Sequence, residues 1–304
     1  MPLRYWVLIF ILGMGWGASF FLNAILLREL GPLSVSMLRI ALGALGCWVW
    51  LAATGGLVPV SLRQLGQMLV LGLFFYGVPL SVYPLAQQHI GSGAAGIVNA
   101  LTPVMVVIVS HLWPGGEKAT ALKSLGVLAG FAGIALLALP ALRSGGGAEL
   151  WAILFAALAP LCYAVAMNHA RSIKGMPPTA LTAWSLTLAT LILTPLALWR
   201  EGVPQITQPQ TWAALGVIGF VLTSAAFILL YWLLPRVGAT ATSTVTFIAP
   251  VSAVVLGVFV LKEELHLPQM IGMLVIFAGL IAIDGRLLRR LYMPRVKPDH
   301  QPDG

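Results

Sequence analysis

Residues 92–112 read SGAAGIVNALTPVMVVIVSHL and contain no Asp, Glu, Lys or Arg. A helix needs about 20 mainly apolar residues to cross a bilayer, and this stretch has that length. Its polar side chains, such as Asn99 and Thr102, are few and neutral. The stretch therefore predicts a membrane-spanning helix, in which Pro103 leaves main-chain carbonyl groups without their helical partners.

The composition of the whole chain agrees with a membrane protein. Of its 304 residues, 59% are hydrophobic and 9% are charged, whereas soluble domains carry about 25% charged residues. This excludes a water-soluble enzyme, a disulfide-rich secreted protein and a disordered chain. Cys47 and Cys162 lie inside apolar runs and are expected to be small core residues. The net charge of +8 is spread singly between apolar runs, which favours the lipid bilayer over nucleic acid as the partner.

Ten apolar runs of membrane-spanning length occur, each bounded by Gly, Pro or charged residues. They are Trp6–Leu27, Leu33–Ala53, Leu65–Ala86, Ser92–Leu112, Leu122–Leu139, Leu150–Ala170, Thr179–Trp199, Trp212–Leu234, Gly238–Leu261 and Pro268–Ile283. Strands of a membrane barrel would instead alternate in polarity over about ten residues. The first run is longer than the apolar core of a signal peptide and is expected to be an uncleaved helix. The predicted fold class is an all-α integral membrane protein with ten transmembrane helices.

The Lys and Arg residues are divided unequally between alternate connections. With the N-terminus inside, twelve lie on the cytoplasmic side, four on the opposite side and one, Arg39, within the second span, which accounts for all 17. Cytoplasmic connections normally hold the excess. We therefore expect a multi-pass protein of the inner (plasma) membrane with both termini cytoplasmic.

The second half of the chain resembles the first. An offset of 147 places Gly72 on Gly219 and Pro103-Val104 on Pro250-Val251, and an offset of 146 places Glu117 on Glu263. Apolar helices share some Gly and Pro by chance, but the spacing from Glu to the following glycines also recurs, which favours a true repeat. Five spans per repeat is an odd number, so the second copy is inverted, as in many secondary transporters. The predicted organisation is a first repeat over 1–143, a second over 144–288 and a polar cytoplasmic tail over 289–304.

Several features recur in both halves and point to a known family. They are a Pro in the fourth and ninth spans, a Glu in the next connection and two Gly in the span after it (Pro103, Glu117, Gly126, Gly133; Pro250, Glu263, Gly272, Gly279). With Trp16-Gly17 and Arg39, they make residues 5–288 resemble the drug/metabolite transporter superfamily, specifically its ten-helix exporters with two EamA-type repeats. The resemblance implies two inverted five-helix repeats around a central cavity, exporting amino acids or related small metabolites. Leu186 stands opposite Arg39, which leaves no symmetric arginine.

Polar side chains are costly inside a membrane, so those present are candidates for substrate binding. Asn99 and Thr102 share a face of the fourth span, and Thr242 and Thr246 share one of the ninth. Asn99 corresponds to Thr246 under the offset, so the two faces are expected to meet across a pseudo-twofold axis. The alternative interpretation is close helix packing, for which small and hydroxylated residues are also used.

Aromatic residues add a second group of candidates. Trp16 and Asn23 share a face of the first span, Tyr76 and Tyr83 one of the third, and Ser224 and Tyr231 one of the eighth. A cavity with aromatic walls and a few polar groups suits apolar or zwitterionic solutes. Packing or placement at the membrane interface is the alternative for these residues.

Arg39 is a charge well inside a span, and two roles are open to it. It attracts an anionic group such as a carboxylate, or it extends outwards and pairs with a neighbouring helix. All nine Asp and Glu residues lie in connections, at span ends or in the tail. The spans therefore lack an acidic proton relay, which favours a facilitator or exchanger.

The sequence thus predicts a secondary transporter that works by alternating access, and the resemblance implies that it exports amino acids or similar metabolites. An exporter of cationic or aromatic drugs is the first alternative. An integral-membrane enzyme acting on lipid intermediates is the second, although no cluster of Asp, His or Arg supports it. No metal-ligand spacing or nucleotide-binding loop is present, so no cofactor, metal or catalytic residue is expected. The sequence leaves the oligomeric state open and is compatible with a monomer.

Overall fold

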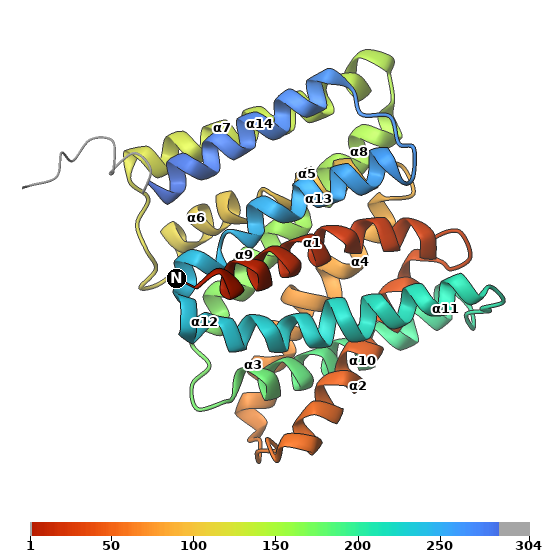
Figure 1. Cartoon of the computed structure of the whole chain (residues 1–304), viewed down its shortest axis with the longest axis vertical. Coiled ribbons are helices and arrows are strands. Elements are labelled where there is room, and N and C mark those ends of the chain that lie inside the picture. Colours follow the sequence, from red (N-terminus) through yellow and green to blue (C-terminus); the bar gives the residue numbers. More distant parts are fainter. Residues whose placement is uncertain (1, 286–304) are drawn as a thin grey trace, which may run out of the picture.

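The computed structural model describes residues 2–285, and all regular secondary structure in that part of the chain is helical (Figure 1). The elements are α1 (Leu3–Leu26), α2 (Pro32–Thr54), α3 (Leu62–Leu71), η1 (Gly72–Gly77), α4 (Val78–Ala86), α5 (Ser92–Asn99), α6 (Thr102–Leu112), α7 (Ala121–Ser144), α8 (Gly147–Ala156), α9 (Leu158–Ala170), α10 (Pro178–Glu201), α11 (Pro209–Gly216), η2 (Val217–Ala225), α12 (Ala226–Thr242), α13 (Val245–Phe259) and α14 (Leu267–Asp284). Within residues 2–285, nine helical segments are long and apolar enough to span a membrane, and α13 is a shorter apolar helix. The predicted all-α membrane fold is confirmed. The predicted tail, residues 289–304, lies outside the described residues.

The helix ends follow the local sequence. Pro32 and Pro178 occupy first-turn positions of α2 and α10, where the missing N–H of proline is not needed. Gly55 and Gly145 end α2 and α7 in the left-handed region, with φ of 67° and 71°. Such glycines commonly end helices because they lack a Cβ.

The ninth predicted span differs from the observed helix. The sequence suggested one run over Gly238–Leu261, but Gly238 has φ 79° and ψ 159° and kinks the helical segment that ends at Thr242. α13 begins only at Val245 and has 15 residues, so it is about 22 Å long at 1.5 Å per residue. A turn at residues 243–244 separates the residues after the kink from α13, so the observed helix is shorter than the predicted span.

The third and eighth spans each contain a wide turn of π-helix. η1 lies between α3 and α4, and η2 lies between α11 and α12. In a π-turn the main-chain hydrogen bond joins residues five apart, and such turns often lie at functional sites. In both halves of the chain, the wide turn thus lies in the third of the five spans.

The helices pair between the two halves of the chain. α7 packs along α14, and α2 packs along α10 (Figure 1). α1 packs on α13, and α6 packs on α9. The first and sixth spans are equivalent in the two repeats, and so are the fourth and ninth. The contact of α1 with α13 (spans one and nine) therefore corresponds to that of α9 with α6 (spans six and four), so the packing is approximately twofold symmetric.

Glycines allow α7 and α14 to approach closely. A Cβ on Gly126 would lie 2.5 Å from the carbonyl oxygen of Gly279, and one on Gly279 would lie 2.7 Å from that of Gly126. Gly133 and Gly272 make the same reciprocal contact, at 2.6 and 2.5 Å. Small residues at such positions let membrane helices pack with their main chains in contact.

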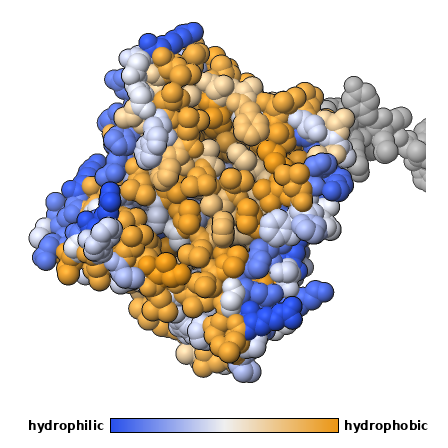
Figure 2. Space-filling model, turned by 180° about the vertical axis from the view of Figure 1, so that it is seen from behind, coloured by the Kyte–Doolittle hydropathy of each residue, from blue (hydrophilic) through white to orange (hydrophobic). Residues whose placement is uncertain are grey.

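The outer surface is suited to lipid. Figure 2 shows a broad hydrophobic area across the middle of one face, with hydrophilic residues at both sides. Large apolar side chains such as Phe10, Val49, Leu154 and Leu191 are exposed on the spanning helices. A hydrophobic surface of this extent marks contact with a membrane.

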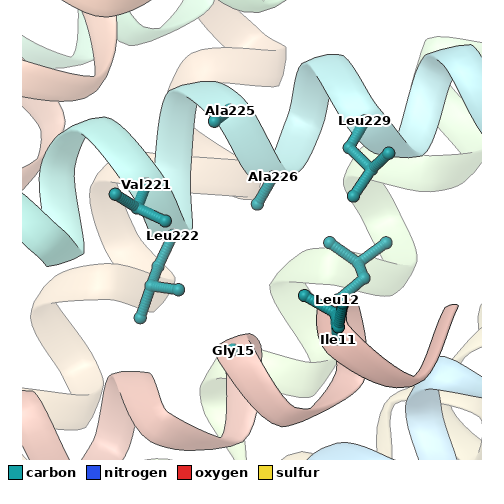
Figure 3. Close-up of a pocket in the computed structure, with 8 residues that line it drawn as sticks. All are labelled: Ile11, Leu12, Gly15, Val221, Leu222, Ala225, Ala226 and Leu229. Carbon is teal, nitrogen blue, oxygen red and sulfur yellow. The ribbon is translucent and has the colours of Figure 1, made fainter. Parts of the chain in front are cut away.

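One shallow hollow lies between α1 and the η2–α12 segment (Figure 3). Its volume is about 110 Å³, and Ile11, Leu12, Gly15, Val221, Leu222, Ala225, Ala226 and Leu229 line it. Ile11 and Val221 are exposed on the outer surface. The hollow is wholly apolar, so it lacks the polar groups of a substrate site.

Candidate functional site

Arg39 lies inside the helix bundle on α2 and is 7% exposed. Its Nε donates to Oγ1 of Thr223 on η2 at 3.2 Å, and one terminal nitrogen donates to Oγ of Ser19 on α1 at 3.2 Å. Among the described residues, no carboxylate contacts the guanidinium. Arg39 is therefore a buried positive charge with hydroxyl partners only.

A second polar pair lies one helical turn further along α1. Asn23, which is 2% exposed, donates from Nδ2 to Oε1 of Gln87 at 3.0 Å. Gln87 donates in turn to the carbonyl oxygen of Phe20 at 2.8 Å. The amide oxygen of Asn23 is buried, and no group in the described part of the chain donates a hydrogen bond to it. Ser19 and Asn23 are four residues apart, so they share a face of α1.

Aromatic rings from several helices pack around Phe227, which lies one turn after Thr223 on the same span. Phe227 is central: its ring lies 5.5 Å from that of Trp16, 5.9 Å from that of Phe75 and 5.3 Å from that of Tyr76. Tyr231 is 6.2 Å from Phe227. These separations are typical of favourable ring pairs. Tyr231 also accepts a hydrogen bond from Oγ1 of Thr182 on α10 at 3.3 Å, so its hydroxyl is partnered.

Tyr163 on α9 extends the aromatic group. Its ring lies 5.2 Å from that of Phe75, which in turn packs against Tyr76 and Phe227. Thr223 precedes Phe227 by one turn of the same span. The predicted residues Trp16, Arg39 and Tyr76 are thus brought together, with Asn23 and Tyr231 beside them.

Tyr83, Asn99 and Thr102 form a separate group on α4, α5 and α6. Tyr83 donates to Oδ1 of Asn99 at 2.8 Å, and Oγ1 of Thr102 donates to the carbonyl oxygen of Asn99 at 2.8 Å. The ring of Tyr83 packs edge-on against Phe20 at 5.0 Å. This group therefore adjoins the Asn23–Gln87 pair through Phe20.

The hydroxyl groups of the other predicted residues bond to the main chain. Thr242 donates to the carbonyl oxygen of Gly238, Thr246 to that of Ser243, and Ser224 to that of Gly43 on α2. No hydrogen bond in the described part of the chain joins Asn99 to Thr246. α5 and α13 do pack together, with Gly96 against Ala253.

The sequence did not single out Ser19, Gln87, Tyr163 or Thr223. Thr223 was missed because the eighth span was taken as a regular α-helix, on which Ser224 and Tyr231 share a face. The wide turn η2 changes that register: the hydroxyl hydrogen of Thr223 reaches the carbonyl group of Ile218, five residues back. Ser19 and Gln87 are recognisable only through partners far away in sequence.

This arrangement offers three kinds of binding group on neighbouring helices. Arg39 has five N–H donors, and two of them are used in the bonds to Ser19 and Thr223. Those that remain suit a carboxylate, which arginine binds through paired charged hydrogen bonds. The buried oxygen of Asn23 is left to accept a hydrogen bond from a ligand N–H group, and the rings around Phe227 form an apolar wall.

Comparison with known proteins gives a consistent family assignment. The chain matches the EamA-like transporter family over residues 3–139 and 150–283. It is 22% identical over 268 residues to the uncharacterized transporter YoaV of Bacillus subtilis, covering 87% of this chain and 91% of that protein. It is 25% identical over 292 residues to protein PecM of Dickeya dadantii, covering 95% and 94%.

Two further matches agree with this assignment. The uncharacterized inner membrane transporter YedA of Escherichia coli is 23% identical over 287 residues, covering 92% of this chain and 90% of that protein. A solved crystal structure superposes with a TM-score of 0.66 at 19% identity, covering 94% of this chain and 99% of that one, which shows a shared fold. The chain therefore belongs to the EamA-like transporter family, and it is a multi-pass membrane transporter.

Proposed function

We propose that this transporter moves amino acids or closely related small metabolites that carry both a carboxylate and an amino group. The observation that carries the proposal is the buried Arg39, which has no acidic partner within residues 2–285 and which bonds to Ser19, one turn of α1 from the unpartnered oxygen of Asn23. An isolated charge inside a membrane protein is costly, and functional sites are where such charges occur.

The substrate contacts follow from these two groups. The carboxylate binds the free N–H donors of Arg39, and the amino group donates to Oδ1 of Asn23. A substrate side chain then lies against Trp16, Tyr76 and Phe227, whose rings accept apolar groups of varied shape. Because Arg39 is positively charged, an exclusively cationic substrate is disfavoured at this position.

Transport is proposed to occur by alternating access in the inner membrane, with both termini cytoplasmic and with export as the direction. The approximate twofold packing and the two family matches support two inverted repeats, over 1–143 and 144–288. The names of the relatives as transporters support a transport role in place of enzymatic turnover. We further propose that the substrate and the bilayer are the partners and that no nucleic acid is bound.

Export of aromatic drugs is a second candidate function. The ring contacts around Phe227 favour it, since planar aromatic solutes stack well on such a surface. The two candidates differ in what they require of Arg39: an amino acid needs the charge, and a neutral or cationic drug does not.

Counterflow in proteoliposomes tests the proposal. Vesicles preloaded with a mixture of amino acids should accumulate labelled members of that class, and an imposed pH gradient should have little effect because the spans lack an acidic relay. Asn23→Leu, which removes the unpartnered amide oxygen at similar volume, should abolish flux while the protein still inserts. Accumulation of aromatic drugs with no amino-acid flux would overturn the proposal in favour of the second candidate.

Cysteine labelling tests the membrane topology separately. Single cysteines at Glu117 and at Glu264, which lies beside Glu263 and is exposed, should react with a membrane-impermeant reagent from opposite sides. Labelling of both positions from the same side would contradict the inverted repeat.

A further inference from the structure

Two carboxylates of the second half join it to the first half at one end of the helix bundle, where Glu29 of the first half also accepts hydrogen bonds from Thr207 and Gln208 of the second half. Glu201, the last residue of α10, accepts hydrogen bonds from the main-chain N–H groups of Leu33 and Ser34 at 2.9 and 2.8 Å, and from Oγ of Ser34 at 2.7 Å. These donors lie in the first turn of α2. A carboxylate at a helix N-terminus is stabilised by both the free N–H groups and the helix dipole.

Glu263, which follows α13, makes the equivalent contact with α5. It accepts from the main-chain N–H groups of Ser92 and Gly93 at 2.8 and 3.1 Å, and from Oγ of Ser92 at 3.0 Å. Gly91 and Gly257 provide the space, since a Cβ on either would lie 2.8 or 2.4 Å from Oε2 of Glu263. We call Glu201 and Glu263 the inter-half carboxylates.

Both inter-half carboxylates lie at the same end. The connections that follow α1, α10 and α13 emerge on the right of Figure 1, opposite the N-terminus. Each inter-half carboxylate belongs to the second half of the chain, and each holds the start of a helix from the first half. Any movement that separates the halves at this end must therefore break both sets of three hydrogen bonds, together with those from Thr207 and Gln208 to Glu29.

The other end of the bundle lacks the corresponding contacts in the described part of the chain. The repeat places Glu117 opposite Glu263, but Glu117 pairs with Lys123 close by in sequence, and its side chain is largely exposed. The offset of 147 places Thr54 opposite Glu201, and Thr54 bonds to the carbonyl oxygen of Trp50 in its own helix. The scaffold is approximately symmetric, whereas these contacts are present at one end only.

We propose that Glu201 and Glu263 form the gate of the transporter at this end, holding it closed in the conformation described here and releasing it when the halves separate. The proposal rests on alternating access as the transport mechanism. The inter-half carboxylates act through helix positions and do not touch the substrate, so they are positioning residues. Their release changes access to the site while the groups around Arg39 stay in place.

Accessibility of the buried Asn23 position measures the gate without any substrate. The reporter is Asn23→Cys in a chain in which Cys47 and Cys162 are replaced by alanine, reconstituted in vesicles and treated with a membrane-impermeant thiol reagent. Glu201→Gln with Glu263→Gln should raise the labelling rate from the gated side by about tenfold or more, because hydrogen bonds to a charged acceptor are roughly twice as strong as neutral ones. Hydrogen exchange at the main-chain N–H groups of Ser34 and Gly93 should accelerate in the same variant.

Glu117→Gln is the matched control, since it removes the repeat-related carboxylate without freeing a helix start. It should leave both labelling and exchange unchanged. If the double glutamine variant does not fold, Ser34→Ala with Ser92→Ala removes one donor from each contact and should raise labelling by a smaller factor. The gate proposal would be overturned if labelling and exchange were unchanged in a folded variant that carries either pair of substitutions. An equal rise in labelling with Glu117→Gln would also overturn it. A failure of solute flux would count against the proposed function alone, because labelling requires no transported solute.

Discussion

The close contact between α7 and α14 predicts that adding a single methyl group at Gly133 destabilises the protein. Gly133→Ala places a Cβ 2.4 Å from Cγ1 of Ile276 and 2.6 Å from the carbonyl oxygen of Gly272. The oxygen belongs to the main chain of α14 and moves only if the helix moves. Overpacking of this kind costs about 1–3 kcal/mol, and alanine recovers up to about 1 kcal/mol because it favours helix over glycine.

The expected net loss is therefore about 1 kcal/mol. Gly66→Ala in α3 is the matched control, since nothing lies within 4 Å of its added Cβ. It should stabilise the protein by about 0.5–1 kcal/mol through helix propensity alone. Thermal unfolding of both variants in the same detergent, followed by the fraction that stays monodisperse, measures the two shifts. Midpoints that move in the same direction would refute the inferred main-chain contact.

Three further predictions concern polar groups. Arg39→Met should lower substrate affinity by about 100-fold or more, since two charged hydrogen bonds contribute about 3 kcal/mol or more. The unfolding midpoint of this variant should be unchanged or higher, because a buried charge is removed. A midpoint drop like that of Gly133→Ala would instead indicate a structural role. The hydrogen bonds from Thr207 lower the pKa of Glu29 from 4.5 to about 2, so their stabilisation is present above pH 4.5 and lost as the pH falls through 2. The midpoint of Glu29→Gln should therefore fall less on acidification than that of the unmodified chain, and parallel curves would contradict this. Trp48→Phe removes the 2.9 Å hydrogen bond from Nε1 to Oγ1 of Thr187 and should lower the free energy of unfolding by about 1 kcal/mol. If the losses from Trp48→Phe and Thr187→Val were additive in the double variant, the hydrogen bond would contribute nothing to stability.

The spans could be predicted closely because bilayer thickness sets their length and because Pro and Gly mark their ends. α2 and α10 begin at Pro32 and Pro178, one residue from the predicted starts at Leu33 and Thr179. The turn at residues 243–244 inside the predicted run Gly238–Leu261 could not be located, since Ser and Thr inside an apolar run are also compatible with an unbroken helix. Local composition therefore predicted where the chain crosses, but not where a crossing bends.

The site was less accessible to prediction for a physical reason. Arg39 was recognised as the unusual charge, but the choice between a ligand and a structural partner depended on which side chains of spans one and eight reach it. Those partners, Ser19 and Thr223, come from residues 20 and 184 positions away. The identity of Thr223 further depends on a wide turn, which moves the face of a helix without changing its composition.

That wide turn also determines which part of Thr223 is offered to Arg39. The hydroxyl hydrogen is directed to the carbonyl oxygen of Ile218 at 2.8 Å, as the five-residue spacing of η2 requires. The oxygen is then left with its lone pairs facing the guanidinium, and it accepts from Nε. The backbone of η2 therefore sets the polarity of the hydroxyl as well as its position. If η2 tightened into an ordinary α-helix, the hydrogen would lose this acceptor, and the charge on Arg39 would lose a correctly oriented dipole.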